Sequence, residues 1–179
     1  MKSLLALSRG IDALNESVGR GVIWLVLAAS LISAGNALAR YGFNQSSNAW
    51  LEIQWYLFSL IFLLGAGYTL KHNGHVRIDV LYVRLSDRGR AWIDLIGGVF
   101  FLLPMSALIV WMGWKFFLSS YVVGETSPDA GGLLRWPIKL AMPLGFLLLW
   151  LQGVSESIKR AAFLVGRMDF VQEAPEETV

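Results

Sequence analysis

The sequence contains no cysteine among its 179 residues, which excludes a disulfide framework, a thiol nucleophile and zinc held by thiolates. It is also poor in charge, because only 16% of its residues are charged, against about 25% in an average globular domain. Histidine occurs only twice. What is abundant is apolar: 55% of the residues are hydrophobic, and the mean hydropathy is +0.55. The position of the few charges therefore decides the class of protein.

Charged residues are missing from whole stretches of the chain. Residues 21–39, 95–114 and 140–155 carry none, and residues 50–70 carry only Glu52. About 20 apolar residues span the hydrocarbon core of a bilayer as a helix. A soluble bundle is the alternative, but its helices would keep a polar face. We therefore predict an all-α integral membrane protein. Its four transmembrane helices are expected at about residues 20–40, 49–70, 92–116 and 137–158.

The segments outside these spans are short, so residues 1–168 are expected to form one membrane domain. Residues 3–18 place an apolar side chain every three or four positions, which predicts an amphipathic helix lying in the membrane plane or docked on another helix. Residues 76–85 mix apolar and charged side chains, which favours a short interfacial helix on the cytoplasmic side. Residues 169–179 form an acidic tail that we expect to be disordered.

The distribution of lysine and arginine predicts the orientation. Eleven of the 15 basic residues lie in the amino-terminal segment, the loop between the second and third spans, and the carboxy-terminal segment. These three regions share one side of the membrane if there are four spans. Because short cytoplasmic loops carry the excess of basic residues, both termini are predicted to be cytoplasmic.

Glu52 is an ionisable residue inside an expected span, and such residues are functional candidates. It lies only three residues into the second span, within about one turn of the outer interface, where water has access. A structural role, such as pairing with Arg40 or with a charge on a partner subunit, is therefore favoured over proton coupling. At the inner end of the third span, Asp94 is expected to pair with Arg90, four residues earlier.

Other motifs do not indicate chemistry. His72 and His75 lie three residues apart on one segment, so they do not present the facing rings that haem requires, and they are too few for zinc. Gly65 and Gly67 are small residues of the kind that let helices pack closely. The sequence has no phosphate loop, dinucleotide fingerprint or nucleophile elbow. We therefore expect no enzymatic activity, cofactor or metal. Membrane lipid explains the basic loop without nucleic acid.

An ordered set of motifs is more specific. Asn36-x3-Arg40-Tyr41-x-Phe43-Asn44 precedes Trp50-x-Glu52, Leu64-Gly65-Ala66-Gly67, Asn73-Gly74-His75-Val76-Arg77-Ile78-Asp79-Val80-Leu81 and, in the fourth span, Pro143-Leu144-Gly145. Their order and spacing, from about residue 10 to residue 165, resemble the small membrane subunit (Q subunit) of TRAP transporters, the tripartite ATP-independent periplasmic family of bacteria.

The resemblance implies a scaffold subunit in the bacterial inner membrane. Its implied partners are a large multi-span permease subunit, which carries substrate and sodium, and a periplasmic binding protein, which delivers an organic acid. On this basis Trp50 and Glu52 are expected in the outer region where partner subunits meet. Gly74, Arg77 and Asp79 are expected to shape the cytoplasmic turn that follows the second span.

One departure from the family pattern concerns acidic residues. Many members have two adjacent acids after the tryptophan, whereas this chain has Glu52 followed by Ile53 and Gln54. Any role that requires a second carboxylate is therefore in doubt. Two alternatives stay open from the residues alone. A self-contained small oligomeric exporter would need a carboxylate near the middle of the membrane, and a membrane anchor of a redox complex would show haem absorbance.

Overall fold

The computed structural model describes residues 2–45, 47–74, 82 and 84–167, and in this part the chain is all helical apart from turns and one isolated bridge. Its elements are α1 (Lys2–Phe43), α2 (Asn48–Lys71), α4 (Asp87–Gly97), the π-helical turn η1 (Gly98–Leu102), α5 (Leu103–Val122) and α6 (Trp136–Leu164). Four helical stretches are long and apolar enough to cross a membrane, which confirms the predicted fold class. The acidic tail and most of the interfacial helix expected over 76–85 lie outside the described residues.

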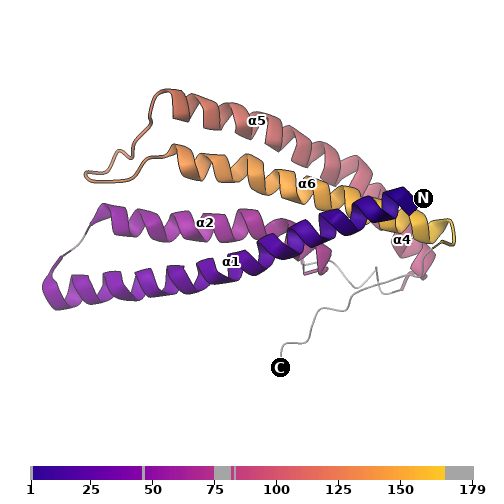
Figure 1. Cartoon of the computed structure of the whole chain (residues 1–179), viewed down its shortest axis with the longest axis horizontal. Coiled ribbons are helices and arrows are strands. Elements are labelled where there is room, and N and C mark those ends of the chain that lie inside the picture. Colours follow the sequence, from indigo (N-terminus) through magenta and orange to yellow (C-terminus); the bar gives the residue numbers. More distant parts are fainter. Residues whose placement is uncertain (1, 46, 75–81, 83, 168–179) are drawn as a thin grey trace.

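The four long helices lie in a row in the order α5, α6, α2 and α1 (Figure 1). The central helix α6 packs against α1, α2, α4 and α5. At one end of the row lie the α1–α2 and α5–α6 connections, and we call it the loop end. At the other, the terminal end, the amino-terminal half of α1 crosses α6 (Figure 1). Large apolar side chains are exposed along the row, among them Leu31, Phe58 and Phe100.

Helix α1 joins two segments that the sequence suggested as separate. The amphipathic segment 3–18 and the first expected span form one uninterrupted 42-residue helix. Its sequence contains Gly19 and Gly21 at the junction but no proline, which would have broken the backbone ladder. Gly19 is buried against the ring of Tyr68 on α2, where a β-carbon would overlap the ring. Close packing on α2 therefore supports the helix through its glycine-containing segment.

The third transmembrane stretch is continuous from Asp87 to Val122 but changes its winding midway. It begins with Ser86, whose Oγ accepts a hydrogen bond from the Gly89 N–H at 3.3 Å, as expected for a capping serine. The turn η1 is π-helical and ends just before Pro104. Proline lacks the N–H that would bond to the carbonyl four residues earlier, and the widened turn accommodates this loss.

The interior of the row is built from small and polar side chains. On α6 the buried residues include Ala141, Gly145, Gly153 and Ser155. A β-carbon on Gly145 would lie 2.5 Å from the carbonyl oxygen of Leu63, so α2 and α6 approach each other backbone to backbone. Among the described large apolar residues, by contrast, only Ile11, Val22 and Phe117 are buried, and many others are exposed. This pattern is typical of helices that pack within lipid, where apolar burial between helices gives little driving force.

Candidate functional site

At the loop end, the carboxylate of Glu52 holds the long connection between α5 and α6. The side chain of Glu52 is in the second turn of α2, and the residue is only 4% exposed. Its Oε2 accepts a hydrogen bond of 2.6 Å from the Leu133 N–H, and its Oε1 accepts one from the Ser127 hydroxyl. We call these three residues the Glu52 clasp. Both carboxylate oxygens are thus engaged within the chain.

Further contacts from α2 fix the same connection. The Tyr56 hydroxyl donates to the carbonyl of Leu134 at 2.8 Å, and the Asn48 amide donates to the carbonyl of Ala130 at 3.0 Å. Within the connection, Thr126 and Leu134 form an antiparallel bridge. The first three turns of α2 therefore position a small hairpin-like loop at several points along its length.

Basic side chains at the start of α6 support the loop. The guanidinium of Arg135 donates to the Ser127 hydroxyl at 3.3 Å and lies 5.5 Å from the centre of the Trp55 ring. Lys139 forms an ion pair with Glu125, which lies in the connection. The hydrogen bond from Lys139 lowers the pKa of the Glu125 carboxyl below its ordinary value. Glu125 consequently stays ionised, and paired with Lys139, throughout the neutral range.

Gly132 makes the clasp sterically feasible. A β-carbon at this position would lie 2.5 Å from the β-carbon of Ser127 and 2.9 Å from Oε1 of Glu52. The stretch contains Gly131 beside Gly132, and glycine is typical of turns, but nothing in this composition indicates that the turns close over Glu52. The partners of Glu52 lie 75 and 81 residues away along the chain, so no local pattern reveals them.

Two other residues of the predicted outer region do not join the clasp. The expectation that Glu52 pairs with Arg40 is wrong, because Glu52 bonds to Ser127 and Leu133 while Arg40 is exposed near the end of α1. Trp50 is also exposed, at 49%. The structure therefore leaves Arg40 and Trp50 on the surface of the loop end and places Glu52 inside it.

The two glycines singled out on α2 differ in their surroundings. Gly67 is buried, and a β-carbon there would overlap the amide oxygen of Asn15 on α1 and lie 3.2 Å from the Leu148 carbonyl of α6. Gly65 has room, since a β-carbon would meet its nearest atom at an ordinary 3.8 Å. Gly67 is thus the point at which α1, α2 and α6 meet closely.

The predicted cytoplasmic turn is described only at its beginning. Gly74 is exposed, and its N–H donates to the carbonyl of Thr69 at 2.9 Å, which closes the end of α2. Arg77 and Asp79 lie outside the described residues. Their expected role in the turn stays a prediction.

A line of buried polar side chains joins α1 to α6 at the terminal end. The Asn15 amide donates to the Gln152 amide oxygen at 2.9 Å, and Gln152 in turn donates to Asp12 at 2.9 Å. Ser155 donates to Asp12 at 2.7 Å and lies 2.7 Å from the hydroxyl of Ser8. We call these five residues the polar seam. Every member except Asp12 is at least 98% buried.

The polar seam was not among the residues singled out in the sequence, although a signal was present. Gln152 and Ser155 are polar residues near the end of an uncharged stretch of the fourth span. In a membrane such side chains need partners, because unpaired polar groups in hydrocarbon are costly. In the amphipathic helix expected over residues 3–18, Asp12 and Asn15 fall away from the apolar stripe, where water would satisfy them.

Ion pairs extend the seam to the other helices. Lys159 of α6 lies 3.3 Å from Asp12. Glu16, one turn further along α1, accepts from Lys71 at 2.7 Å and lies 3.0 Å from His72 at the end of α2. The first half of α1 is therefore tied to both α2 and α6 by charged side chains.

Asp94 of α4 has a different partner from the one expected. It forms an ion pair with Arg160 of α6, at 3.2 Å, instead of with Arg90 on its own helix. The guanidinium of Arg90 lies 3.7 Å from Asp87. The expected pair was based on helix spacing alone, whereas the observed pair crosses between helices and ties α4 to the central helix.

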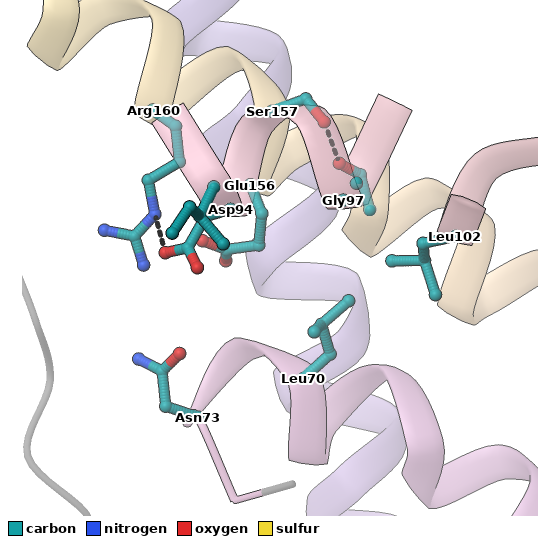
Figure 2. A pocket seen from close by; sticks show the side chains of 11 residues that line it. Leu70, Asn73, Asp94, Gly97, Leu102, Glu156, Ser157 and Arg160 are labelled. Atoms are coloured by element: carbon teal, nitrogen blue, oxygen red, sulfur yellow. Dashed lines mark hydrogen bonds and ion pairs between the residues drawn. The ribbon is translucent and has the colours of Figure 1, made fainter. Parts of the chain in front are cut away.

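A cavity of about 290 Å³ lies beside this ion pair, and its lining changes from polar to apolar (Figure 2). Asp94, Glu156 and Arg160 gather on one side, and Leu70 and Leu102 lie apart from them (Figure 2). Within the described residues, no group of three or more acidic or histidine side chains could hold a metal ion. The cavity thus offers a mixed polar and apolar surface.

We expect Gln152→Leu to destabilise the protein, because it removes three hydrogen bonds from a buried network. Interhelical hydrogen bonds in membranes contribute about 0.6 kcal/mol each on average. Three of them correspond to a fall in Tm of roughly 4–7 °C for a chain of this size. Thermal unfolding of the wild type and the variant in detergent measures this difference in Tm. Ser30→Ala is the matched control, since exposed Ser30 bonds only to the Val26 carbonyl of its own helix. Equal melting of both variants and wild type would contradict a stabilising seam.

Comparison with known proteins shows that most of the chain matches one protein family. Residues 29–163 match the family described as tripartite ATP-independent periplasmic transporters, DctQ component. The chain is 28% identical over 150 residues to the ectoine TRAP transporter small permease protein TeaB of Halomonas elongata, covering 83% of this chain and 77% of that protein. It is 35% identical over 96 residues to the C4-dicarboxylate TRAP transporter small permease protein DctQ of Rhodobacter capsulatus, covering 52% and 40%. No solved structure matches it.

Proposed function

The chain belongs to the DctQ family of small permease subunits of TRAP transporters, and from this premise we propose that it is the scaffold subunit of a sodium-driven transporter. It is a multi-pass protein of the inner membrane. The proposed partners are a large permease subunit, which moves the substrate, and a periplasmic binding protein, which delivers an organic acid. The single observation that carries the proposal is the family match across residues 29–163.

The open row of helices supports a partner within the membrane. Large side chains such as Phe58, Phe62, Phe100 and Phe101 are 70–73% exposed, far more than a closed bundle would leave accessible. Large contiguous apolar surfaces on a protein mark contacts with other proteins or with lipid. We propose that one face of the row packs on the large permease subunit and that the other faces lipid.

We propose that the loop end faces the periplasm, as the distribution of basic residues predicts. The Glu52 clasp then gives the α5–α6 connection a defined shape on that side, with Pro128 and Asp129 exposed at its tip. A preorganised loop binds with a smaller loss of conformational freedom than a flexible one. In this proposal Glu52 acts on the binding protein through the loop that it holds, with Trp50 exposed beside it.

The engagement of Glu52 argues against the exporter alternative. An ion-coupled carrier needs an ionisable group that can bind and release its ion during transport. Both oxygens of Glu52 accept hydrogen bonds from the loop, and the residue lies at the loop end of α2, away from the middle of the helix. This arrangement favours a structural role for Glu52 in a subunit that depends on a partner for transport.

Reconstitution in liposomes tests the proposed function. We expect substrate uptake only when this chain, the large permease subunit and the binding protein are all present with an inward sodium gradient. Liposomes with this chain alone should show no uptake above the protein-free background. Substrate flux through the chain alone would overturn the scaffold proposal in favour of a self-contained carrier.

A further inference from the structure

The first half of α1 carries three different surfaces. Its buried face, which includes Ser8, Ile11 and Asn15, packs on the rest of the chain. A charged flank lies to one side of this face and contains Arg9, Asp12, Glu16 and Arg20, while an apolar flank lies to the other and contains Leu7 and Leu14, joined by Leu4 one turn before Ser8. Since residues three and four apart share a helix face, each flank is a continuous stripe.

The apolar flank is left uncovered by the chain itself. Leu4, Leu7 and Leu14 are 48%, 53% and 45% exposed, although the helix that carries them is firmly attached through its polar face. In a helix docked on a soluble protein the whole apolar stripe packs inward, whereas here Ile11 is buried and the three leucines are not. The leucines therefore require an apolar environment other than this chain.

The depth of the segment identifies that environment. Asn15 lies beside Leu148 and Gln152, and Ser8 lies beside Ser155, so the segment runs alongside the last turns of the fourth expected span. It does not project beyond the end of α6 into water over this length. A helix at this level has hydrocarbon on one side and headgroups or water on the other.

The charges fit that position. Asp12 and Glu16 on the charged flank pair with Lys159 and Lys71, which lie at the ends of α6 and α2. Arg9 is exposed on the same flank. Charged flank and apolar flank are thus separated as the two sides of a membrane interface require, with basic groups where anionic lipid headgroups would lie.

A second observation points to hydrocarbon as the occupant. Beside Leu4 lies an apolar cavity of about 260 Å³, whose lining includes Leu103 at the start of α5 and Val154 and Ile158 of α6. It lies at the level of the same inner turns of α6. A cavity with so little polar lining does not hold water well, whereas a flexible acyl chain can fill it.

We propose that residues 2–18 of α1 form an interfacial strap in the cytoplasmic leaflet. The leucines of its apolar flank lie among lipid acyl chains, one chain enters the cavity beside Leu4, and Arg9 lies at the headgroups. The strap fixes α1 across the inner end of the row. This inference concerns the chain in lipid and does not depend on the identity of its partners.

The natural absence of cysteine makes the strap directly testable. We suggest single replacements Leu7→Cys, Leu14→Cys and, as the matched control on the charged flank, Arg9→Cys, each in the full chain reconstituted in liposomes. A charged thiol reagent that cannot enter lipid should label the two leucine positions roughly tenfold more slowly than position 9. A fluorophore at position 7 should be quenched by lipids that carry a nitroxide near the top of the acyl chain.

Two outcomes would overturn the strap. Equal labelling of positions 7 and 9 would mean that the apolar flank is exposed to water. Slow labelling at position 7 without quenching by nitroxide lipid, in the chain alone or in the complete transporter, would mean that protein covers the flank instead of lipid. Wild-type thermal stability of the three variants, measured alongside, would show that each retains the native fold.

Discussion

A Gly145→Ala variant is expected to lose much of the stability of the helix row. The added β-carbon would lie 2.5 Å from the carbonyl oxygen of Leu63 and 2.7 Å from its carbonyl carbon. These are backbone atoms of α2, so no side-chain rotation relieves the overlap, and the central helices α2 and α6 must separate. Overpacking of this kind typically costs about 1–3 kcal/mol. For a chain of this size Tm should fall by about 2–12 °C.

The control for this variant is another helical glycine with open surroundings. A β-carbon on Gly35 of α1 would meet no atom within 4 Å. Because alanine favours a helix more than glycine does, Gly35→Ala should leave Tm unchanged or raise it slightly. Thermal unfolding of both variants in the same detergent makes the comparison. If Gly145→Ala and Gly35→Ala have the same Tm, the close approach of α2 and α6 is not a source of stability.

Glu52→Gln is expected to release the α5–α6 connection and to reduce uptake by the complete transporter. A glutamine keeps the shape of the side chain but places an NH2 donor against the Leu133 N–H or the Ser127 hydroxyl, both of which donate to Glu52. Hydrogen bonds to a charged group contribute about 1.5–3 kcal/mol. The loss of one such bond should increase opening of the loop by roughly tenfold or more.

Amide hydrogen exchange reports on this opening directly. The Leu133 N–H bonds to Glu52 in the wild type, so its exchange should accelerate by roughly tenfold in Glu52→Gln. Asp129→Asn is the matched control, since it makes the same chemical change in an exposed carboxylate at the tip of the same loop. Uptake measured in parallel relates the loop to transport. Unchanged exchange at Leu133 in Glu52→Gln would show that the clasp does not hold the loop in solution.

The sequence was sufficient to predict the membrane-spanning helices but not the contacts between them. Charge-free stretches fix where helices can cross, because a buried charge in hydrocarbon is costly wherever it occurs. The predicted partner of Asp94, Arg90, was wrong because the prediction assumed that charged residues four positions apart on one helix pair with each other. In the structure Arg160 approaches Asp94 from another helix.

The polar seam illustrates a second limit. Patterns of apolar and polar residues predict which face of a helix is buried when the solvent is water. For residues 3–18 that rule would place Leu7 and Leu14 inside and Asn15 outside. In the structure the packed face is shifted, so that Ile11 and Asn15 are buried while Leu7 and Leu14 are exposed. At the edge of a membrane, hydrogen bonds between helices decide the packed face, and the leucines are left for the surroundings.

The Glu52 clasp could not be predicted from the sequence for a third reason. Glu52 was singled out from the sequence, and its position near the outer end of the second span favoured a structural role, which stays a prediction. Its partners Ser127 and Leu133 lie in a segment whose composition indicates only turns. Long-range closure of a loop over a side chain depends on how the helices are ordered in the row, and that order is not encoded in any single segment.

The π-helical turn at Gly98–Leu102 has a consequence for register. Its hydrogen bonds enclose one residue more than those of an α-helix, and one residue corresponds to about 100° of rotation. The part of the helix that carries Asp94 is therefore out of phase with the part that packs around Gly113. Consider a relative in which this helix is α-helical throughout. Its residues equivalent to Asp94 and Gly113 would both face α6 only if one residue fewer lay between them. In a sequence alignment, a gap of one residue at Gly98–Leu102 would therefore indicate that the relative lacks the π-helical turn. The segment that carries Asp94 should be aligned separately from the residues that follow this turn.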